Sequence, residues 1–256
     1  MKKTKEPIEK FVKIVKRLRK ECPWDREQTH KSIRHSLIEE TYEVVEAIDQ
    51  NDPNELKKEL GDLLLHIVLH AVMAEEEKSF TLEDIIDSIS EKMVRRHPHV
   101  FGNVVAKDSH EVKRNWEHIK MTEGRKSVID GVPKEMPALL RALRIQEKAS
   151  KVGFDWKKKR DVWKKVDEEI GELAGAEKSK NHDHIEEEYG DLLFSLVNYS
   201  RFIGVNPEFA LKGSIDKFSK RFYHIEKELQ RRGKCIGTVS MKEMDKIWDA
   251  KKKMKE

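Results

Sequence analysis

Two acidic stretches decide the fold of this chain, because each of them occurs twice. The first copy reads Leu37-Ile38-Glu39-Glu40-Thr41-Tyr42-Glu43 and is followed by Glu59-Leu60-Gly61-Asp62-Leu63-Leu64. The second copy reads Lys165-Val166-Asp167-Glu168-Glu169-Ile170-Gly171-Glu172 and is followed by Glu188-Tyr189-Gly190-Asp191-Leu192-Leu193. Five acids of the first copy lie at one constant offset from their counterparts, as Glu43 with Glu172 and Glu59 with Glu188 illustrate. Such a repeat in register indicates duplication of one module.

The repeat also sets the expected domain boundaries. A second match, at a slightly shorter offset, pairs two basic residues of each copy: Lys92 and Arg96 with Lys217 and Arg221. The first copy therefore carries about four extra residues before this basic pair. We expect one module over 1–120 and another over 136–256. The linker 121–135 contains Gly124, Gly131 and Pro133, which are turn and breaker residues.

Composition and periodicity predict an all-α fold. Charged residues make up 39% and hydrophobic residues 37% of the chain, against roughly 25% and 45–50% in typical domains. Apolar residues recur at helical spacing over 8–20, 27–50 and 53–77, and no segment alternates convincingly with period two. Asp52 followed by Pro53 is a typical helix start, and Thr81 and Asn206 are candidate caps for later helices. We therefore expect two tandem antiparallel helical bundles.

Several classes of protein are excluded or disfavoured by the same sequence. No apolar run is long enough for a membrane span, and the segment 1–20 lacks the apolar core of a secretory signal. Cys22 and Cys235 lie far apart, which argues against a disulfide framework and favours a reducing cytoplasm. The net charge of +4 is small for so many charges and predicts no specific nucleic-acid partner.

The acids are spaced to meet on two facing helices. Glu40 and Glu43 share one helix face, and the turn before Asp52 folds the next helix back against the first. Glu43 precedes Asp52 by nearly the same distance along the chain as Asp62 follows it, so their heights along the pair match. Clustered carboxylates repel one another unless a cation binds, and oxygen ligands favour Mg²⁺, with Mn²⁺ possible. The candidate ligands are Glu39, Glu40, Glu43, Glu59, Asp62, Glu168, Glu169, Glu172, Glu188 and Asp191.

Basic and aromatic residues are candidates for substrate binding. Mg²⁺ usually binds substrate phosphates as well as carboxylates, so cations are expected nearby. The candidates are Lys165, Lys217, Arg221, Lys92, Arg96 and Trp248. The same lysines are also compatible with an ordinary exposed helix face, and Trp248 either stacks on a base or anchors its helix in the core.

Other interpretations have weaker support. A single acidic motif of this kind is most often a solvated helix face, but both motifs in both copies argue against that. His66 and His70 correspond to Ser195 and Tyr199, so the duplicated chemistry does not need them. The position three after the second-helix glutamate is an aspartate rather than a histidine, which disfavours a di-iron bundle. His182-Asp183-His184 falls in an expected turn and lacks the other ligands of a histidine–aspartate phosphohydrolase.

The pattern EExxE followed by ExxD on antiparallel helices resembles the MazG family of nucleoside triphosphate pyrophosphohydrolases. Supporting stretches are Cys22-Pro23-Trp24-Asp25, Arg95-Arg96-His97-Pro98-His99-Val100-Phe101 and Gly131-Val132-Pro133. The resemblance covers nearly the whole chain. It implies Mg²⁺-dependent hydrolysis of nucleoside triphosphates to the monophosphate and pyrophosphate, a homodimer with sites near the subunit interface, and removal of unwanted nucleotides.

The resemblance also assigns roles to residues, while two alternatives stay open. One carboxylate, Glu172 or Glu43 in the first copy, is the expected catalytic base. The second copy resembles the nucleotide site, and both copies keep all five acids. The alternatives are an all-α phosphohydrolase with a different or narrower substrate, and a nucleotide-binding regulatory protein without turnover.

Overall fold

Helices build both units into which the chain divides. The computed structural model describes residues 2–108, 111–112, 115–116, 119, 123–124 and 126–253, and within them it contains helices and no strand. Unit 1 spans Met1–Val112 and unit 2 spans Lys113–Glu256. Part of the expected linker 121–135 and the end of the first expected module lie outside the described residues. None of the described helices has the length and hydrophobicity that a membrane span needs.

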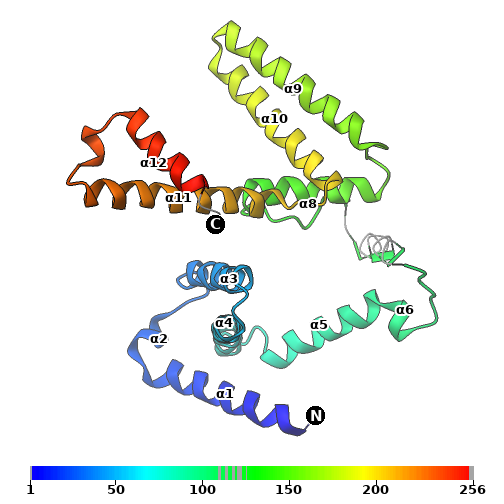
Figure 1. Ribbon diagram of the computed structural model, residues 1–256. Helices are drawn as coiled ribbons and strands as arrows, with labels where there is room; N and C mark the ends of the chain where they lie inside the picture. Colours follow the sequence, from blue (N-terminus) through cyan, green and yellow to red (C-terminus); the bar gives the residue numbers. More distant parts are fainter. Residues whose placement is uncertain are drawn as a thin grey trace. The chain divides into compact units, whose positions relative to one another are not determined.

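Unit 1 is built around one long central helix (Figure 1). Helix α4 contacts α1, α3 and α5, so three helices use it as a common support. The short helices α2 and α6 contact α1 and α5 respectively. The helices are α1 (Lys2–Glu21), α2 (Pro23–Glu27), α3 (Arg34–Asp49), α4 (Pro53–Glu76), α5 (Leu82–Arg96) and α6 (Pro98–Phe101).

Unit 2 contains two helical pairs. Helices α9 and α10 form an antiparallel hairpin, and α10 also contacts α8, while α12 folds back on α11 (Figure 1). Helix α11 contacts α8 as well. The helices are α8 (Ala138–Lys151), α9 (Lys159–Ser179), α10 (His182–Phe202), α11 (Pro207–Arg231), the 3₁₀ turn η1 (Ile236–Thr238) and α12 (Met241–Lys253).

Capping residues mark the starts of several helices, and one predicted helix start was wrong. Asp52, Thr81 and Asn206 each cap the helix that follows by accepting backbone N–H bonds, as the sequence predicts. The prediction of one helix over 27–50 was wrong, because α3 begins only at Arg34. In the preceding turn, the Thr29 N–H donates to Ser32 Oγ and the Ser32 N–H donates to Thr29 Oγ1, at 2.9 and 3.1 Å. These local bonds compete with the helix.

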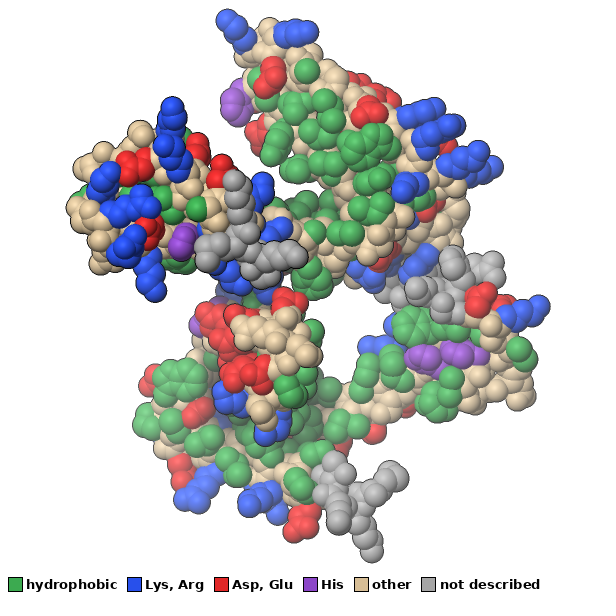
Figure 2. Space-filling model, in the orientation of Figure 1, with side chains coloured by type: hydrophobic (Ala, Val, Ile, Leu, Met, Phe, Trp, Pro, Cys, Tyr) green, Lys and Arg blue, Asp and Glu red, His purple; other side chains and the backbone are tan. Residues whose placement is uncertain are grey.

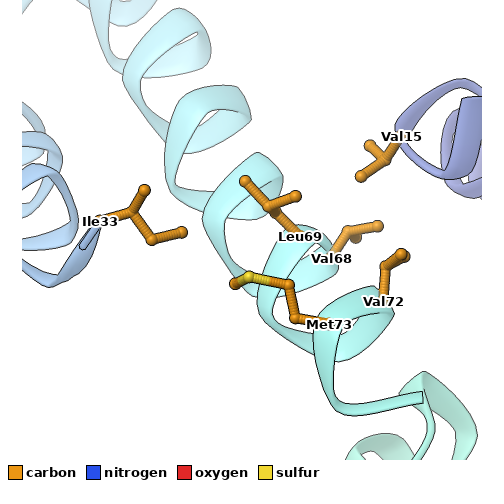
Figure 3. Packing of buried hydrophobic residues seen from close by; sticks show 6 residues of the cluster. All are labelled: Val15, Ile33, Val68, Leu69, Val72 and Met73. Carbon is orange, nitrogen blue, oxygen red and sulfur yellow. The ribbon is translucent and has the colours of Figure 1, made fainter. Parts of the chain in front are cut away.

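The core of unit 1 holds α4 against its neighbours. Figure 3 shows Val15 of α1 and Ile33, just before α3, pointing toward apolar residues of α4. Ile33 and Val68 are each only 2% exposed. Because Ile33 is buried at the very start of α3, it fixes where α3 leaves the α4 surface. This packing positions the acidic face of α3 beside α4.

Candidate metal centre

The α3–α4 hairpin brings three acids of the first copy together. Its turn contains Asn51 in the left-handed region at φ 54°, and Asp52 accepts N–H bonds from residues 54 and 55. The chain therefore reverses sharply, and α3 packs along α4. One carboxylate oxygen from each of Glu40, Glu43 and Glu59 lies within 4.8 Å of the others.

The α9–α10 hairpin repeats this construction in the second copy. Its turn contains Lys180 at φ 56°, and the Asn181 side chain caps α10. One carboxylate oxygen from each of Glu169, Glu172 and Glu188 lies within 4.8 Å of the others. We call the two sets the first triad (Glu40, Glu43, Glu59) and the second triad (Glu169, Glu172, Glu188). Their members occupy corresponding positions of the sequence repeat.

Two of the five candidate ligands in each copy lie outside its triad. Glu39 and Glu168 are exposed, and Glu168 instead accepts a hydrogen bond from Lys165 at 2.7 Å. Asp62 and Asp191 are also exposed, one turn beyond the triad glutamate of their helix. Each triad therefore draws two acids from one helix and one from its partner.

Burial and mutual repulsion mark the first triad. The Glu59 side chain is buried, with the residue only 8% exposed. Desolvation, together with the neighbouring carboxyl groups of Glu55 and Glu43, raises the pKa of Glu59 to about 7. Desolvation also raises the pKa of Glu40, and Glu43 adds to the effect. No Lys or Arg ion pair to these three acids appears in the structure's described part. His66 Nε2 lies 3.9 Å from Glu40 Oε1, and the nearby Lys58 pairs with Glu55 at 2.8 Å.

A lysine beside the second triad offsets part of its negative charge. Lys165 Nζ lies 2.7 Å from Glu168 and 2.8 Å from the buried carboxylate of Glu169. These two acids hold the pKa of Lys165 above its usual range. Desolvation raises the pKa of Glu172, and the charge of Lys165 opposes that rise. The position equivalent to Lys165 in the first copy is Ser36, which supplies no charge.

The triads fit a small divalent cation. Mg²⁺ binds oxygen ligands at about 2.1 Å, so two ligands on opposite sides of the ion lie about 4.2 Å apart. The triad oxygens already lie within 4.8 Å of one another, so small side-chain adjustments would close the site. All three donors are carboxylates, and hard oxygen donors suit Mg²⁺ or Mn²⁺ better than Zn²⁺. His184 Nε2 lies 3.1 Å from Glu188 Oε1 and orients that carboxylate from outside the triad.

The structure places the other predicted binding residues on different helices. Lys217 and Arg221 lie on α11 and Trp248 on α12, and these two helices pack together. The Arg221 guanidinium lies over the Trp248 ring, 5.4 Å from its centroid. Trp248 also packs against the small core of Ile225, Leu229 and Ile247, which anchors α12. In unit 1, the half-buried Lys92 and Arg96 lie on α5.

Sequence reasoning missed a pocket that adjoins the second triad. It has a volume of about 650 Å³ and reaches from Glu169, Lys165 and Asp191 to the loop after α8. Phe154 and Trp156 of that loop line it. No general motif marks such a pocket in the sequence. The usable signal is a pair of aromatic residues shortly after Gly153, at the end of a helix.

Fold and site together define an all-α protein with two tandem carboxylate sites. The family model described as the MazG nucleotide pyrophosphohydrolase domain matches residues 28–101 and 158–226, and each matched segment contains one complete triad. This chain therefore belongs to the MazG family, which confirms the resemblance and the prediction of an all-α fold with two tandem copies.

Full-length relatives agree with the family model. The chain is 44% identical to the Thermotoga maritima nucleoside triphosphate pyrophosphohydrolase/pyrophosphatase MazG, over 96% of this chain and 95% of that protein. It is 42% identical to the Escherichia coli K12 nucleoside triphosphate pyrophosphohydrolase, over 96% and 97%. The crystal structure of a mazG-related protein from Thermotoga maritima covers 44% of this chain and 98% of its own, at 29% identity and a TM-score of 0.40.

Proposed function

We propose that this protein is a Mg²⁺-dependent nucleoside triphosphate pyrophosphohydrolase, which converts ribo- and deoxyribonucleoside triphosphates to the monophosphate and pyrophosphate. Membership of the MazG family and the names of two full-length relatives support this activity. The observation that carries it is the pair of carboxylate triads at matching positions. The same proposal places the protein in the cytoplasm, where it removes surplus or noncanonical nucleotides.

The second triad suits the reaction in charge and geometry. A Mg²⁺ ion held by these carboxylates would polarise phosphate oxygens and make a water molecule more acidic. Glu169 and Glu188, with Asp191 one turn further along α10, are the proposed ligands, and Lys165 neutralises charge beside them. Glu172, the remaining triad acid, is proposed to act as the base that accepts the proton of the attacking water rather than as a ligand. Its raised pKa is compatible with that role. Glu43 is the equivalent base in the first copy.

A homodimer would cover an apolar stripe that both hairpins leave exposed. The stripe follows i, i+4 and i+7 spacing on α4 and on α10, at positions that correspond in the repeat. Its members are between 39% and 55% exposed: Leu60, Leu64 and Ile67 in the first copy, and Tyr189, Leu193 and Leu196 in the second. Hydrophobic side chains gather over the α9–α10 hairpin in Figure 2. We propose that a second copy packs on this stripe.

Dimerisation would also explain why the basic residues lie on other helices. Lys217 and Arg221 are on α11, whereas the second triad is on α9 and α10. In a dimer, α11 of either subunit becomes available to the triphosphate. We propose that Lys217 and Arg221, with Trp248, bind substrate there, and that Lys92 and Arg96 do so in the first copy. Size-exclusion chromatography with light scattering tests the dimer, and Leu193→Asp is expected to shift it toward the monomer.

Product analysis tests the activity directly. The purified protein is incubated with each nucleoside triphosphate, with Mg²⁺ or with EDTA, and products are separated by ion-exchange chromatography. We expect monophosphate and pyrophosphate in equal amounts, and only with the metal. Orthophosphate with diphosphate would indicate a different phosphohydrolase. Nucleotide binding without any product would indicate a regulatory protein. Either outcome would overturn the proposed activity.

A further inference from the structure

His66 is a buried side chain with an unpaired ring nitrogen. The residue is only 9% exposed and lies on α4, two turns beyond Glu59 of the first triad. Its Nδ1 is buried and has no hydrogen-bond partner within the described part of the structure. Its Nε2 lies 3.9 Å from Glu40 Oε1, which is too long for a hydrogen bond. A buried polar group without a partner is unfavourable, so packing alone does not explain a histidine here.

The separation of His66 and Glu40 matches that of two ligands on one metal ion. Metal bonds to imidazole nitrogen and to carboxylate oxygen are about 2.0–2.2 Å long, so two such ligands lie roughly 2.9–4.2 Å apart. The observed 3.9 Å between Nε2 and Oε1 falls within that range. A direct N–H···O hydrogen bond would instead bring the two atoms to about 2.7–3.2 Å. The spacing therefore suits an ion between the two atoms better than direct contact.

Asp62 adds a third possible ligand to this pair. It is an exposed residue of α4, one turn before His66, so the two side chains share one face of the helix. Desolvation raises the pKa of Glu40, and the charges of Glu43 and Asp62 add to that rise. Desolvation lowers the pKa of His66, which favours the neutral imidazole that binds metals. Glu40, Asp62 and His66 therefore offer two carboxylates and one imidazole, next to the first triad and sharing Glu40 with it.

The second copy has no nitrogen at the corresponding position. Ser195 occupies it, and the Ser195 Oγ donates to the Leu192 carbonyl oxygen at 2.9 Å. That hydroxyl is satisfied within its own helix, whereas His66 Nδ1 is not. The positive charge beside the second triad comes instead from Lys165. The two copies therefore offer different donors, with an imidazole available only beside the first triad.

An imidazole ligand changes which ion a site prefers. Mg²⁺ takes oxygen ligands, whereas imidazole suits transition metals such as Zn²⁺. We propose that His66, together with Glu40 and Asp62, binds a divalent transition-metal ion such as Zn²⁺ in unit 1, while the second triad binds its ion through oxygen alone. This inference rests on the proposed function in one respect, namely that the carboxylate cluster of unit 1 is a cation site.

Isothermal titration calorimetry of the full-length, metal-free protein with Co²⁺ and with Mg²⁺ tests the role of the imidazole. Co²⁺ is the probe for Zn²⁺, because it also binds nitrogen and oxygen ligands. The variants are His66→Ser and His66→Gln. Serine already occupies the corresponding buried position in the second copy, and glutamine keeps more of the side-chain volume. The matched control is His182→Ser, which removes an exposed histidine of unit 2 outside both triads.

We expect both His66 variants to weaken one Co²⁺ site at least about tenfold. Mg²⁺ binding should stay within about twofold of the wild type, because Mg²⁺ does not need the nitrogen. Proton NMR of the Co²⁺-loaded protein gives a second readout. Paramagnetic Co²⁺ at Nε2 should shift the buried Nδ1 proton of His66 far outside the normal range. That resonance should be absent from both His66 variants and present in His182→Ser.

Three results would overturn the proposal. One is unchanged Co²⁺ affinity in a His66 variant whose circular dichroism spectrum remains helical. Another is an equal loss of Co²⁺ and Mg²⁺ affinity, which would indicate a structural role for the histidine. The third is an equal loss of Co²⁺ affinity in His182→Ser, which would indicate general binding to surface histidines. No nucleotide is present in these titrations, so a protein that shows the expected His66 dependence but releases no pyrophosphate would refute the proposed function alone.

Discussion

Replacing Glu188 by glutamine should raise stability without metal and reduce the stabilisation that Mg²⁺ provides. Glu188 and Glu169 have oxygens no more than 4.8 Å apart. At that separation two unit charges repel by about 0.9 kcal/mol in water and about 3.5 kcal/mol at an effective dielectric constant of 20. Lys165 beside Glu169 offsets part of this repulsion. We therefore expect Glu188→Gln to stabilise metal-free unit 2 by about 1 kcal/mol, which corresponds to about 2–4 °C in Tm.

With Mg²⁺, the wild-type protein should be more stable than Glu188→Gln, because it gains binding free energy that the variant largely loses. A ligand that binds only the folded state stabilises it by RT ln(1 + [L]/Kd), or about 2.7 kcal/mol at 100 times Kd. The glutamine keeps the shape of the side chain and its hydrogen bond to His184, so packing changes little. Differential scanning calorimetry in EDTA and then in millimolar Mg²⁺ measures both effects on the same protein.

Glu187→Gln is the matched control, since it removes an exposed charge on the same helix outside the triad. It should leave both Tm values within about 1 °C of the wild type. An ion-pair network without a metal role predicts another pattern, in which Glu188→Gln lowers Tm equally in both buffers. That equal loss would refute the interpretation of the triad as a cation site.

Three further outcomes follow from individual residues. Glu172→Ala should lower kcat/KM for nucleoside triphosphates about 10²–10⁴-fold while leaving the circular dichroism spectrum helical, and normal turnover would remove Glu172 from the base role. Leu229→Ala empties a side chain that is 1% exposed and should cost about 2–5 kcal/mol in urea unfolding of unit 2. Hydrogen bonds from Arg231 and Arg232 lower the pKa of Glu228 from 4.5 to about 2, so its stabilisation is present above pH 4.5 and lost as pH falls toward 2; acid titrations of Glu228→Gln should show a shallower loss over that range.

The sequence predicted the features that depend on local order. Helix periodicity and the caps at Asp52, Thr81 and Asn206 placed most helices, because these signals act within one or two turns. The in-register repeat predicted that acids on paired helices converge, and the structure brings three of the five together in each copy. The start of α3 was predicted too early, because Thr29 and Ser32 hydrogen-bond to each other instead of continuing a helix.

The pocket of unit 2 could not be predicted in the same way, because it depends on contacts between distant segments. Gln146 on α8 bonds to Phe194 on α10, 48 residues later, and Asp155 pairs with Arg201 across 46 residues. Neither pair follows a helical or strand period. Periodicity also identifies which acids face a partner helix but not how deeply each is buried. Glu59 and Asp62 share one face of α4, yet only Glu59 is buried.

The two copies keep the same triad but differ in the charge beside it. In the second copy Lys165 neutralises part of the acidic charge, whereas the first copy has Ser36 there and a titratable His66 in place of Ser195. The first triad has two carboxyl groups with raised pKa values, including Glu59 at about 7, and its nearby Lys58 pairs with Glu55 outside the triad. A bound cation must therefore displace more protons there at neutral pH. The second triad, with Lys165 beside it and an aromatic pocket adjoining it, is the better equipped of the two for a nucleotide.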